Sequence, residues 1–316
     1  MLLWYGGKEM NLWALKGSLK LYDRLDAHTW FRVGGPCLGV FSPLNIHDLC
    51  QFIRQVSKPY RILGAGSNVL VHDEGWPGFV IKLQKGFHSI TVENHRIRVQ
   101  AGALDRVVAQ TAQKAGLSGL EFLYTIPGTI GGALALNAGC YGHEISNVLE
   151  EVTVMSPSGE LHVLSPKELG YEYRRCALPF GWIFIEAVLS CTPSDPSKIL
   201  ELMRRYVQQR QNSQPLQVRT GGSTFKNPPG SFAWKWIDAV GARGERLGDA
   251  QCSSTHCNFL INLGNATAQD LWALGSQIQT RVRLAHQVNL EWEIHIWDET
   301  LFFQSQQEQY AALASY

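Results

Sequence analysis

The sequence lacks an excess of charge of either sign. Its 316 residues include 28 lysines and arginines against 27 aspartates and glutamates, which gives a formal net charge of +1. Such a balance offers no electrostatic basis for nucleic acid or an anionic membrane as the main partner, although local basic spots can bind a phosphorylated small molecule. With 45% hydrophobic and 17% charged residues, the composition is typical of a soluble globular protein with room for two or three domains.

The cysteines lack the spacing of a disulfide framework. There are seven, an odd number, and no Cys-x-x-Cys pair occurs. Cys252, His256 and Cys257 lie close together, but the sequence has no second ligand pair at metal-site spacing, so we expect a structural role and no metal. Reduced thiols of this kind indicate a cytoplasmic protein.

A secretory leader and an unbroken apolar run of membrane-spanning length are also missing. The first residues, MLLWYGGKEMNLW, have no basic segment ahead of an apolar core. Residues 122–140 carry no charge, but a proline and several glycines interrupt them. This stretch predicts tightly turned backbone within a soluble fold.

Strand and helix patterns alternate along the chain. Period-two stretches predict hairpins at 90–99 and 152–163, and the run GWIFIEAVL at 181–189 predicts a strand buried on both faces. Helices are predicted after Ser194-Asp195-Pro196 and after Thr267, where Asp270 completes a pattern like a capping box. A cluster of Pro, Ser and Asp predicts a linker near 192–198. The combination indicates an α+β protein with two or three lobes.

A glycine-rich loop follows an apolar run in the segment RILGAGSNVLV at 61–71. Gly64-Ala65-Gly66 is similar to the start of a dinucleotide fingerprint, but Val69 replaces the third glycine and no long helix pattern follows. A P-loop is excluded because no Gly-Lys-Ser or Gly-Lys-Thr follows. Two interpretations stay open from this segment alone: a nest of backbone N–H groups that binds an anion, or an ordinary turn between strands.

Two further glycine-rich runs favour the anion-binding interpretation. They are FRVGGP at 31–36 and IPGTIGGA at 126–133. Three separated loops of small residues suggest backbone that wraps an extended ligand such as a dinucleotide. Arg32 is then either a surface cation or a phosphate partner, and close helix packing can also explain the second run.

Seven segments, in order, resemble the UDP-N-acetylenolpyruvoylglucosamine reductase (UDP-N-acetylmuramate dehydrogenase) family, flavoenzymes of bacterial peptidoglycan precursor synthesis. Each segment is weak alone, but the ordered set, which covers about residues 28–297, is specific. The segments are HTWFRVGGP (28–36), ILGAGSNVLV (62–71), GLEFLYTIPGTIGGALALNAGCYGHEI (119–145), YEYRRC (171–176), GGSTFKNPPG (221–230), STHCNFLIN (254–262) and LEWEI (290–294).

The resemblance implies an α+β architecture with a two-subdomain FAD-binding fold of the vanillyl-alcohol-oxidase (PCMH) type and a C-terminal α+β substrate-binding domain. We place the two FAD-binding subdomains at 1–85 and 86–196, the substrate-binding domain at 197–300 and a tail at 301–316. About 45 residues separate Arg174 from Gly221, which is typical of the family's shorter subgroup, without the segment that carries a substrate-gating tyrosine. The resemblance leaves the gating of the pocket open.

The resemblance also implies FAD as cofactor, NADPH as hydride-donating co-substrate, and UDP-N-acetylglucosamine enolpyruvate as the acceptor that becomes UDP-N-acetylmuramate. We expect a cytoplasmic monomer whose partners are these small molecules, with no nucleic acid and no membrane insertion. The phosphates at the loop 64–68 are expected to be those of the cofactor. The expected FAD contacts are Arg32, Gly64, Ala65, Gly66, Ser67, Asn68, Thr125, Gly128, Gly131 and Gly132.

The family's three catalytic positions are matched by Arg174, Ser223 and Glu293. Arg174 corresponds to the cation that pairs with the substrate carboxylate, although Cys176 stands where the family motif has serine. Ser223 corresponds to the proton donor, and Glu293 to the acid that stabilises the developing negative charge, with a pKa raised by burial if it faces the flavin cleft. From the residues alone, three neighbours are alternatives: Arg175, Thr224 and Glu291.

Tyr124, Lys226 and Asn227 are the expected substrate contacts, and Lys226 is also a candidate helper for Ser223. Two other functions stay open. One is a flavin oxidase of the same fold that passes electrons from an alcohol to oxygen, and the other is an inactive nucleotide-binding module. An arginine, a serine and a glutamate suit an anionic enol better than an alcohol, and competent residues at all three positions argue against lost activity.

Overall fold

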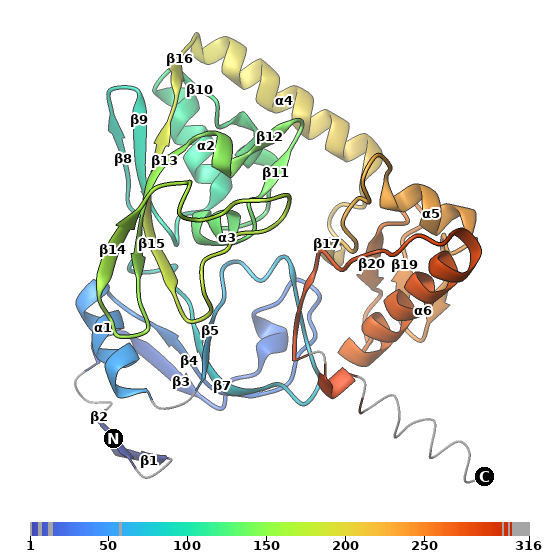
Figure 1. The fold of residues 1–316 in the computed structure, drawn as a ribbon, viewed down its shortest axis with the longest axis horizontal. Helices are drawn as coiled ribbons and strands as arrows, with labels where there is room; N and C mark the ends of the chain where they lie inside the picture. Colours follow the sequence, from blue (N-terminus) through green and yellow to red (C-terminus); the bar gives the residue numbers. More distant parts are fainter. Residues whose placement is uncertain are drawn as a thin grey trace. The chain divides into compact units, whose positions relative to one another are not determined.

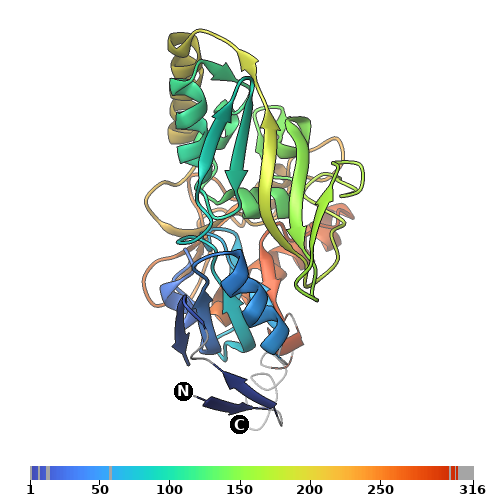
Figure 2. The ribbon, with the colours of Figure 1, turned by 90° about the vertical axis from the view of Figure 1, so that its left-hand side faces the viewer.

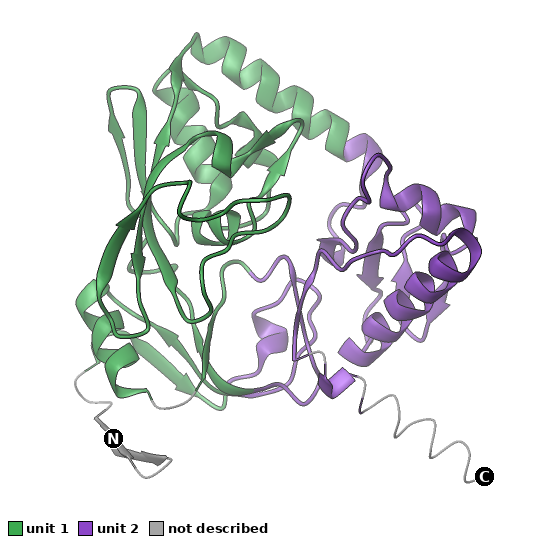
Figure 3. Cartoon of the chain, viewed as in Figure 1, with its two compact units in different colours: residues 1–22, 38–65, 77–210 green, residues 23–37, 66–76, 211–316 purple. Residues whose placement is uncertain are grey.

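The computed structural model describes residues 15–56, 59–298, 300–302 and 304, together with the backbone of 2–5 and 8–11. Figure 1 shows the order of the elements, and Figure 3 shows the two compact units into which the chain divides. Unit 1 comprises residues 1–22, 38–65 and 77–210, and unit 2 comprises 23–37, 66–76 and 211–316. Strands β1 (Leu2–Tyr5) and β2 (Lys8–Asn11) pair with each other.

Unit 1 contains a four-stranded sheet, in the order β3-β4-β7-β5, with helix α1 (Ile46–Gln55) packed on it. The helix begins after Asn45, whose side chain accepts a hydrogen bond from the backbone N–H of Asp48 at 3.0 Å. Its Phe52 stacks on Phe41 of β4 at 4.3 Å and meets Phe79 of β7 edge-on at 5.4 Å. The strands are β3 (Ser18–Leu21), β4 (Cys37–Ser42), β5 (Tyr60–Ile62) and β7 (Trp76–Ile81).

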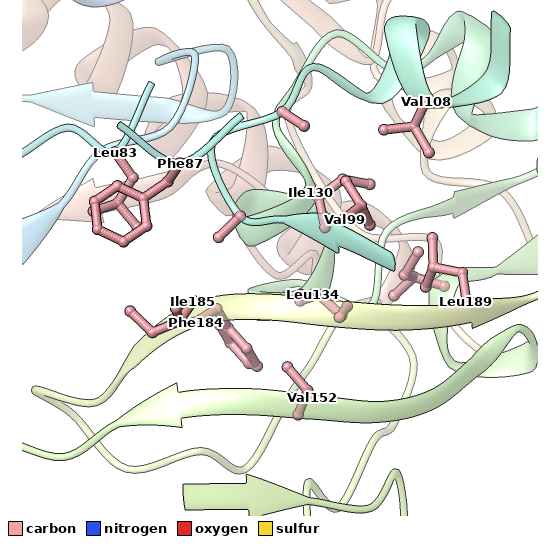
Figure 4. Packing of buried hydrophobic residues seen from close by; sticks show 14 of the residues in the cluster. Leu83, Phe87, Val99, Val108, Ile130, Leu134, Val152, Phe184, Ile185 and Leu189 are labelled. Carbon is pink, nitrogen blue, oxygen red and sulfur yellow. The ribbon is translucent and has the colours of Figure 1, made fainter. Parts of the chain in front are cut away.

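The second sheet of unit 1 has five antiparallel strands in the order β14-β13-β15-β9-β8, side by side in Figure 2. The two predicted hairpins are β8–β9 and β13–β14, and the predicted buried strand is the central β15. Ile130 and Leu134 of α3 share one buried cluster with Val99 and Leu189 of the sheet (Figure 4). The elements are β8 (Ile90–Glu93), β9 (Arg96–Gln100), β13 (Leu149–Met155), β14 (Leu161–Leu164), β15 (Ile183–Ser190), α2 (Asp105–Lys114) and α3 (Ile130–Ala135).

The long helix α4 (Pro196–Ser213) begins at the proline that the sequence indicated. It follows β16, which pairs with β10, and it buries Ile199 and Met203 in the core of unit 1. Unit 1 therefore extends to Arg210, later than the linker predicted at 192–198. The shorter connecting elements are β10 (Leu117–Ser118), η3 (Glu121–Thr125), β11 (Gly139–Cys140), β12 (His143–Glu144), η4 (Ile145–Asn147) and β16 (Thr192–Pro193).

Unit 2 is built on a four-stranded antiparallel sheet in the order β17-β20-β19-β18, against which α6 (Ala268–His286) packs. The predicted capping box is present: Thr267 Oγ1 accepts from the N–H of Asp270 at 3.0 Å, and the Asp270 carboxylate accepts from the N–H of Thr267 at 2.9 Å. The other elements are β17 (Arg219–Ser223), β18 (Arg246–Leu247), β19 (Ala250–Cys252), β20 (Phe259–Asn262) and α5 (Ala233–Ala239).

Two segments from the first quarter of the chain complete unit 2. Strand β6 (Val69–Val71) pairs in parallel with β21 (His295–Trp297), and the Asp73 carboxylate accepts from the N–H of Ala268 at 2.9 Å, at the start of α6. Asn262 Nδ2 donates to the carbonyl of Phe31 at 2.8 Å, close to η2 (Leu25–Ala27). The compact units are therefore interleaved in sequence, and the division into FAD-binding and substrate-binding domains at 85 and 196 stays a prediction.

The uncharged run 122–140 lies within η3, α3, β11 and the turns between them. In the part of the chain that the structure describes, no helix is long and apolar enough to cross a membrane. The predicted tightly turned backbone is confirmed at Asn137, which has a φ of +44°.

Candidate active site

The glycine-rich loop 64–68 connects β5 to β6, so a strand follows it and the predicted absence of a Rossmann helix is confirmed. A Cβ at Gly64 would lie 2.6 Å from Thr129 Oγ1. Gly66 has a φ of +71°, and a Cβ there would lie 2.0 Å from the carbonyl oxygen of His28. The backbone N–H groups of Gly64, Ala65 and Gly66 have no acceptor among the described residues. These three donors fit an anion, as the nest interpretation requires.

Packing explains part of the second glycine-rich run. Gly131 donates its N–H to the carbonyl of Ala101 at 2.8 Å, and a Cβ on it would meet Ala101 at 3.1 Å. A Cβ at Gly128 would lie 2.5 Å from a carboxylate oxygen of Asp105. Gly132 donates to the N-cap side chain of α3 at 3.4 Å. Each of these glycines therefore has a structural role, and the predicted contacts with FAD stay a proposal.

The side chain of Arg174 contacts the turn that leads into β11. Its Nη2 donates to the carbonyl of Gly139 at 2.6 Å, and its Nη1 lies 3.6 Å from a carboxylate oxygen of Glu144. The side chain of Arg174 is 18% exposed, whereas that of Arg175 is 66% exposed and pairs with Glu172 at 3.2 Å on the surface. Burial therefore distinguishes Arg174, the predicted catalytic cation, from its neighbour.

Three cysteines that drew attention in the sequence donate hydrogen bonds to backbone carbonyls. Cys176, at the position of the motif serine, donates to Leu169 at 3.5 Å, Cys252 to Cys257 at 3.0 Å, and Cys257 to Trp234 at 3.1 Å. Burial raises the pKa of all three thiols, which keeps them protonated as donors. Among the described residues, no group of three or more His, Cys, Asp and Glu side chains could hold a metal ion.

Ser223 and Glu293 lie on neighbouring segments of unit 2. The backbone N–H of Glu293 donates to the carbonyl of Thr224 at 2.8 Å, next to Ser223 in the chain. Both Ser223 and Glu293 are half-buried. Asn68 Nδ2 donates to the carbonyl of Glu293 at 3.1 Å, which ties the glycine-rich loop to the same segment. The fold therefore brings together two of the three predicted catalytic residues and one predicted cofactor contact.

The sequence neighbours of these two residues have other roles. Thr224 is 1% exposed, and its Oγ1 accepts from the N–H of Leu260 at 3.1 Å, so its hydroxyl belongs to the sheet. The side chain of Glu291 is 74% exposed and pairs with Lys226 Nζ at 3.3 Å. Lys226, the candidate helper for Ser223, is thus held by an exposed carboxylate.

Four further predicted contact residues, Arg32, Tyr124, Thr125 and Asn227, each make a bond within their own unit, and none of the four bonds involves a carboxylate. Arg32 is exposed, and it and Asn227 lie in unit 2, whereas Tyr124 and Thr125 lie in unit 1. The bonds are Arg32 Nη1 to the Ala27 carbonyl at 3.1 Å, Arg106 Nη2 to Tyr124 Oη at 2.9 Å, Thr125 Oγ1 to the Phe122 carbonyl at 3.2 Å, and the Ala233 N–H to Asn227 Oδ1 at 3.0 Å.

No sequence motif singles out two charged residues of unit 1, Asp105 and Arg210. Asp105, the first residue of α2, is 0% exposed, and both of its carboxylate oxygens lack a hydrogen-bond partner among the described residues. Arg210, in the last turn of α4, donates to the carbonyl of Thr125. An acid in the first turn of a helix and a base in the last are common, so only tertiary burial makes these two residues unusual.

Comparison with known proteins gives the class of protein first. Residues 39–165 match the family model described as an FAD binding domain, and residues 214–297 match the one described as the C-terminal domain of UDP-N-acetylenolpyruvoylglucosamine reductase. The chain is therefore an FAD-dependent oxidoreductase with the predicted α+β fold of the vanillyl-alcohol-oxidase type. The unpartnered N–H groups of the loop 64–66 fit the diphosphate that FAD carries.

The relatives then give the family. The UDP-N-acetylenolpyruvoylglucosamine reductase of Paramagnetospirillum magneticum is 48% identical, over 89% of this chain and 92% of the relative, and that of Gluconobacter oxydans is 45% identical, over 92% and 95%. The crystal structure of the reductase from Thermus caldophilus matches with a TM-score of 0.79 and 37% identity, over 90% of this chain and 99% of that one. The chain belongs to the UDP-N-acetylenolpyruvoylglucosamine reductase family.

Proposed function

We propose that the chain reduces the enolpyruvyl group of UDP-N-acetylglucosamine enolpyruvate to the lactyl group of UDP-N-acetylmuramate, with NADPH as the electron source, in peptidoglycan precursor synthesis. The proposal rests on the family membership and on the match of Arg174, Ser223 and Glu293 to the family's catalytic positions. We also propose that the protein acts in the cytoplasm as a monomer.

Each of the three residues has a task in adding a hydride and a proton across the double bond. Bound FAD, reduced by NADPH, would supply the hydride for the outer vinyl carbon. Negative charge then develops on the substrate carboxylate, where Arg174 offers a permanent cation and Glu293 a hydrogen bond. Ser223 gives its hydroxyl proton to the inner carbon and regains one from solvent, so that one hydride and one proton are added in each turnover.

One observation carries the assignment within unit 2: the N–H of Glu293 bonds to the carbonyl of Thr224 at 2.8 Å, beside Ser223, while Thr224 and Glu291 are committed elsewhere. This pairing supports a proton donor and a charge-stabilising acid on adjacent backbone. The contact of Asn68 Nδ2 with the carbonyl of Glu293 supports a cofactor loop next to them.

Stopped-flow spectroscopy of the purified holoprotein tests the proposal. NADPH is expected to bleach the flavin absorbance, and the UDP-sugar enolpyruvate to restore it faster than air does. Restoration by oxygen alone, at the same rate with and without the UDP-sugar, would favour an oxidase. If the purified protein is colourless and takes up no FAD, the proposed enzymatic activity is excluded.

Three matched pairs of variants test the residue roles. Ser223→Ala is expected to keep flavin reduction by NADPH and to lose reoxidation by the UDP-sugar, with the exposed Ser254→Ala as control. Arg174→Gln and Glu293→Gln are expected to do the same, with Arg175→Gln and Glu291→Gln as controls from the surface pairs. Loss of both half-reactions together would point to lost flavin or misfolding and not to the assigned roles.

A further inference from the structure

Arg210 is a cation of unit 1 without a carboxylate partner among the described residues. Its Nη1 donates to the backbone carbonyl of Thr125 in η3, and the groups that act on it electrostatically are the thiol of Cys140 and the phenol of Tyr141. Both are neutral at physiological pH, and burial raises the pKa of each. The guanidinium is therefore partly removed from water without an anion to balance its charge.

Two other arginines of the chain, Arg98 and Arg243, show the usual pairing with a carboxylate. Arg98 pairs with Glu186 at 2.8 Å, and Arg243 pairs with Asp238 at 2.8 Å. A guanidinium stays charged when it is buried, so an unpaired one raises the free energy of the folded protein. Burial lowers the pKa of Arg210, whereas hydrogen bonds to carboxylates raise those of Arg98 and Arg243.

The location of Arg210 in the last turn of α4 does not account for its unpaired charge. A base in the last turn of a helix is stabilised by the carbonyl groups that end the helix. The hydrogen bond of Arg210, however, goes to a carbonyl of η3 and not to one of its own helix. One turn earlier, Tyr206 stacks on Tyr141 with ring centroids 4.0 Å apart, and Tyr141 Oη donates to the carbonyl of Tyr206 at 2.9 Å. These contacts fix α4 so that Arg210 reaches the turn around β11.

A second guanidinium, that of Arg174, also acts electrostatically on the thiol of Cys140. Both Arg210 and Arg174 favour the charged form of the Cys140 thiol, against the larger effect of burial, so both guanidiniums lie within electrostatic range of this sulfur atom. Arg174 has Glu144 nearby at 3.6 Å, whereas Arg210 has no such carboxylate. Arg210 thus lies beside Cys140 as a partly buried cation with which no described carboxylate pairs.

We propose that Arg210, which lies beside Cys140, is an anion-binding residue that pairs with a carboxylate or phosphate group of a nucleotide ligand. The inference rests on the proposed function for the identity of the ligand, which is either the FAD diphosphate or an anionic group of the UDP-sugar. Arg210 is then a ligand-binding residue that contributes a hydrogen-bonded charge.

The substitution Arg210→Met keeps an unbranched apolar stem and removes the charged guanidinium, and Arg210→Lys keeps the charge but not the planar fork. Arg205→Met, on the exposed face of the same helix, is the matched control. In a first measurement, thermal unfolding of the full-length apoprotein is expected to show Arg210→Met at least as stable as wild type, because an unpaired charge has been removed. A clearly lower Tm of the apoprotein would show that Arg210 serves the fold and would overturn the proposal.

Two binding titrations then distinguish the sources of the anion. FAD is titrated into the apoprotein by fluorescence, and UDP-N-acetylglucosamine enolpyruvate into the oxidised holoprotein by flavin absorbance. Loss of one hydrogen bond to a charged group weakens binding by about 10- to 100-fold, so Arg210→Met should show this change in one arm, Arg210→Lys a smaller change, and Arg205→Met none. The arm that responds identifies the ligand.

The result that overturns the inference is equal affinity of wild type and Arg210→Met in both arms, within about twofold. If the proposed function is wrong, the titrations give a different result: wild type binds FAD but not the UDP-sugar. In that case the FAD arm still tests Arg210.

Discussion

Replacement of Asp105 by asparagine is expected to stabilise the folded protein near neutral pH and to have little effect in acid. The side chain of Asp105 is 0% exposed, and neither carboxylate oxygen has a hydrogen-bond partner among the described residues. Burial raises the pKa of Asp105 well above its usual value, and no neighbouring charge contributes to that shift. The charged form is thus disfavoured in the folded protein and well solvated in the unfolded chain.

The magnitude follows from proton binding in the two states. The unfolded carboxyl has a pKa of about 3.9, and the folded one keeps its proton to higher pH. The free energy of unfolding therefore falls by about 1.4 kcal/mol for each pH unit above about pH 4, until the folded pKa is reached. Asparagine does not titrate, so Asp105→Asn should lose this slope and gain about 1–3 kcal/mol near neutral pH.

Urea unfolding of the full-length apoprotein, followed by circular dichroism from about pH 5 to about pH 8, measures this difference. Asp195→Asn is the control, for which the opposite change in the free energy of unfolding is expected. The exposed Asp195 carboxylate accepts from the N–H of Ser197 at 2.7 Å, and this bond lowers the pKa of Asp195. That variant should lose stability above the acid range and match wild type at low pH. Equal or lower stability of Asp105→Asn near neutral pH would refute the reasoning, because it would mean that the folded Asp105 carboxylate is ionised and paired.

Three further substitutions have expected outcomes. Gly128→Ala places a Cβ 2.5 Å from a carboxylate oxygen of Asp105 and should lower the free energy of unfolding by about 1–3 kcal/mol, with part of the loss recovered in the double variant with Asp105→Ala. Gly66→Ala combines a φ of +71° with a Cβ 2.0 Å from the His28 carbonyl, and should cost at least about 2 kcal/mol and lower the flavin content read from visible absorbance. Phe302→Ala removes a ring that is 0% exposed and should cost about 3–5 kcal/mol in urea unfolding, and an unchanged midpoint would contradict its place in the core.

Local structure was readable from the sequence wherever neighbours in the chain decide it. The capping box at Thr267 needs contacts three residues apart, the turn at Asn94 joins two adjacent strands, and the apolar run that forms β15 is buried whatever its partners. The segment 290–296 shows the limit. Apolar and polar residues alternate along it from Leu290, as in a strand, but the regular strand β21 begins only at His295, where β6 supplies the hydrogen bonds.

The choice between neighbouring candidates needed the fold. Ser223 and Thr224 are both hydroxyls, and only the bond from the Leu260 N–H shows that the second belongs to the sheet. In the same way, solvent exposure and a surface partner separate Arg175 from Arg174. The family resemblance favours the same residues, Ser223 and Arg174, and their catalytic roles stay a prediction.

The sequence by itself determined the family, the α+β class, the cofactor, two hairpins and the starts of α4 and α6, because motifs and periodicity depend on residues a few positions apart. Tertiary structure alone decided that residues 23–37 and 66–76 join the C-terminal unit, where Asp73 bonds to the N–H of Ala268 almost two hundred residues away. Among the described residues, it also showed the buried carboxyl of Asp105 without a hydrogen-bond partner and the guanidinium of Arg210 without a carboxylate. Desolvation is a property of the packed surroundings, and no pattern of neighbours along the chain records it.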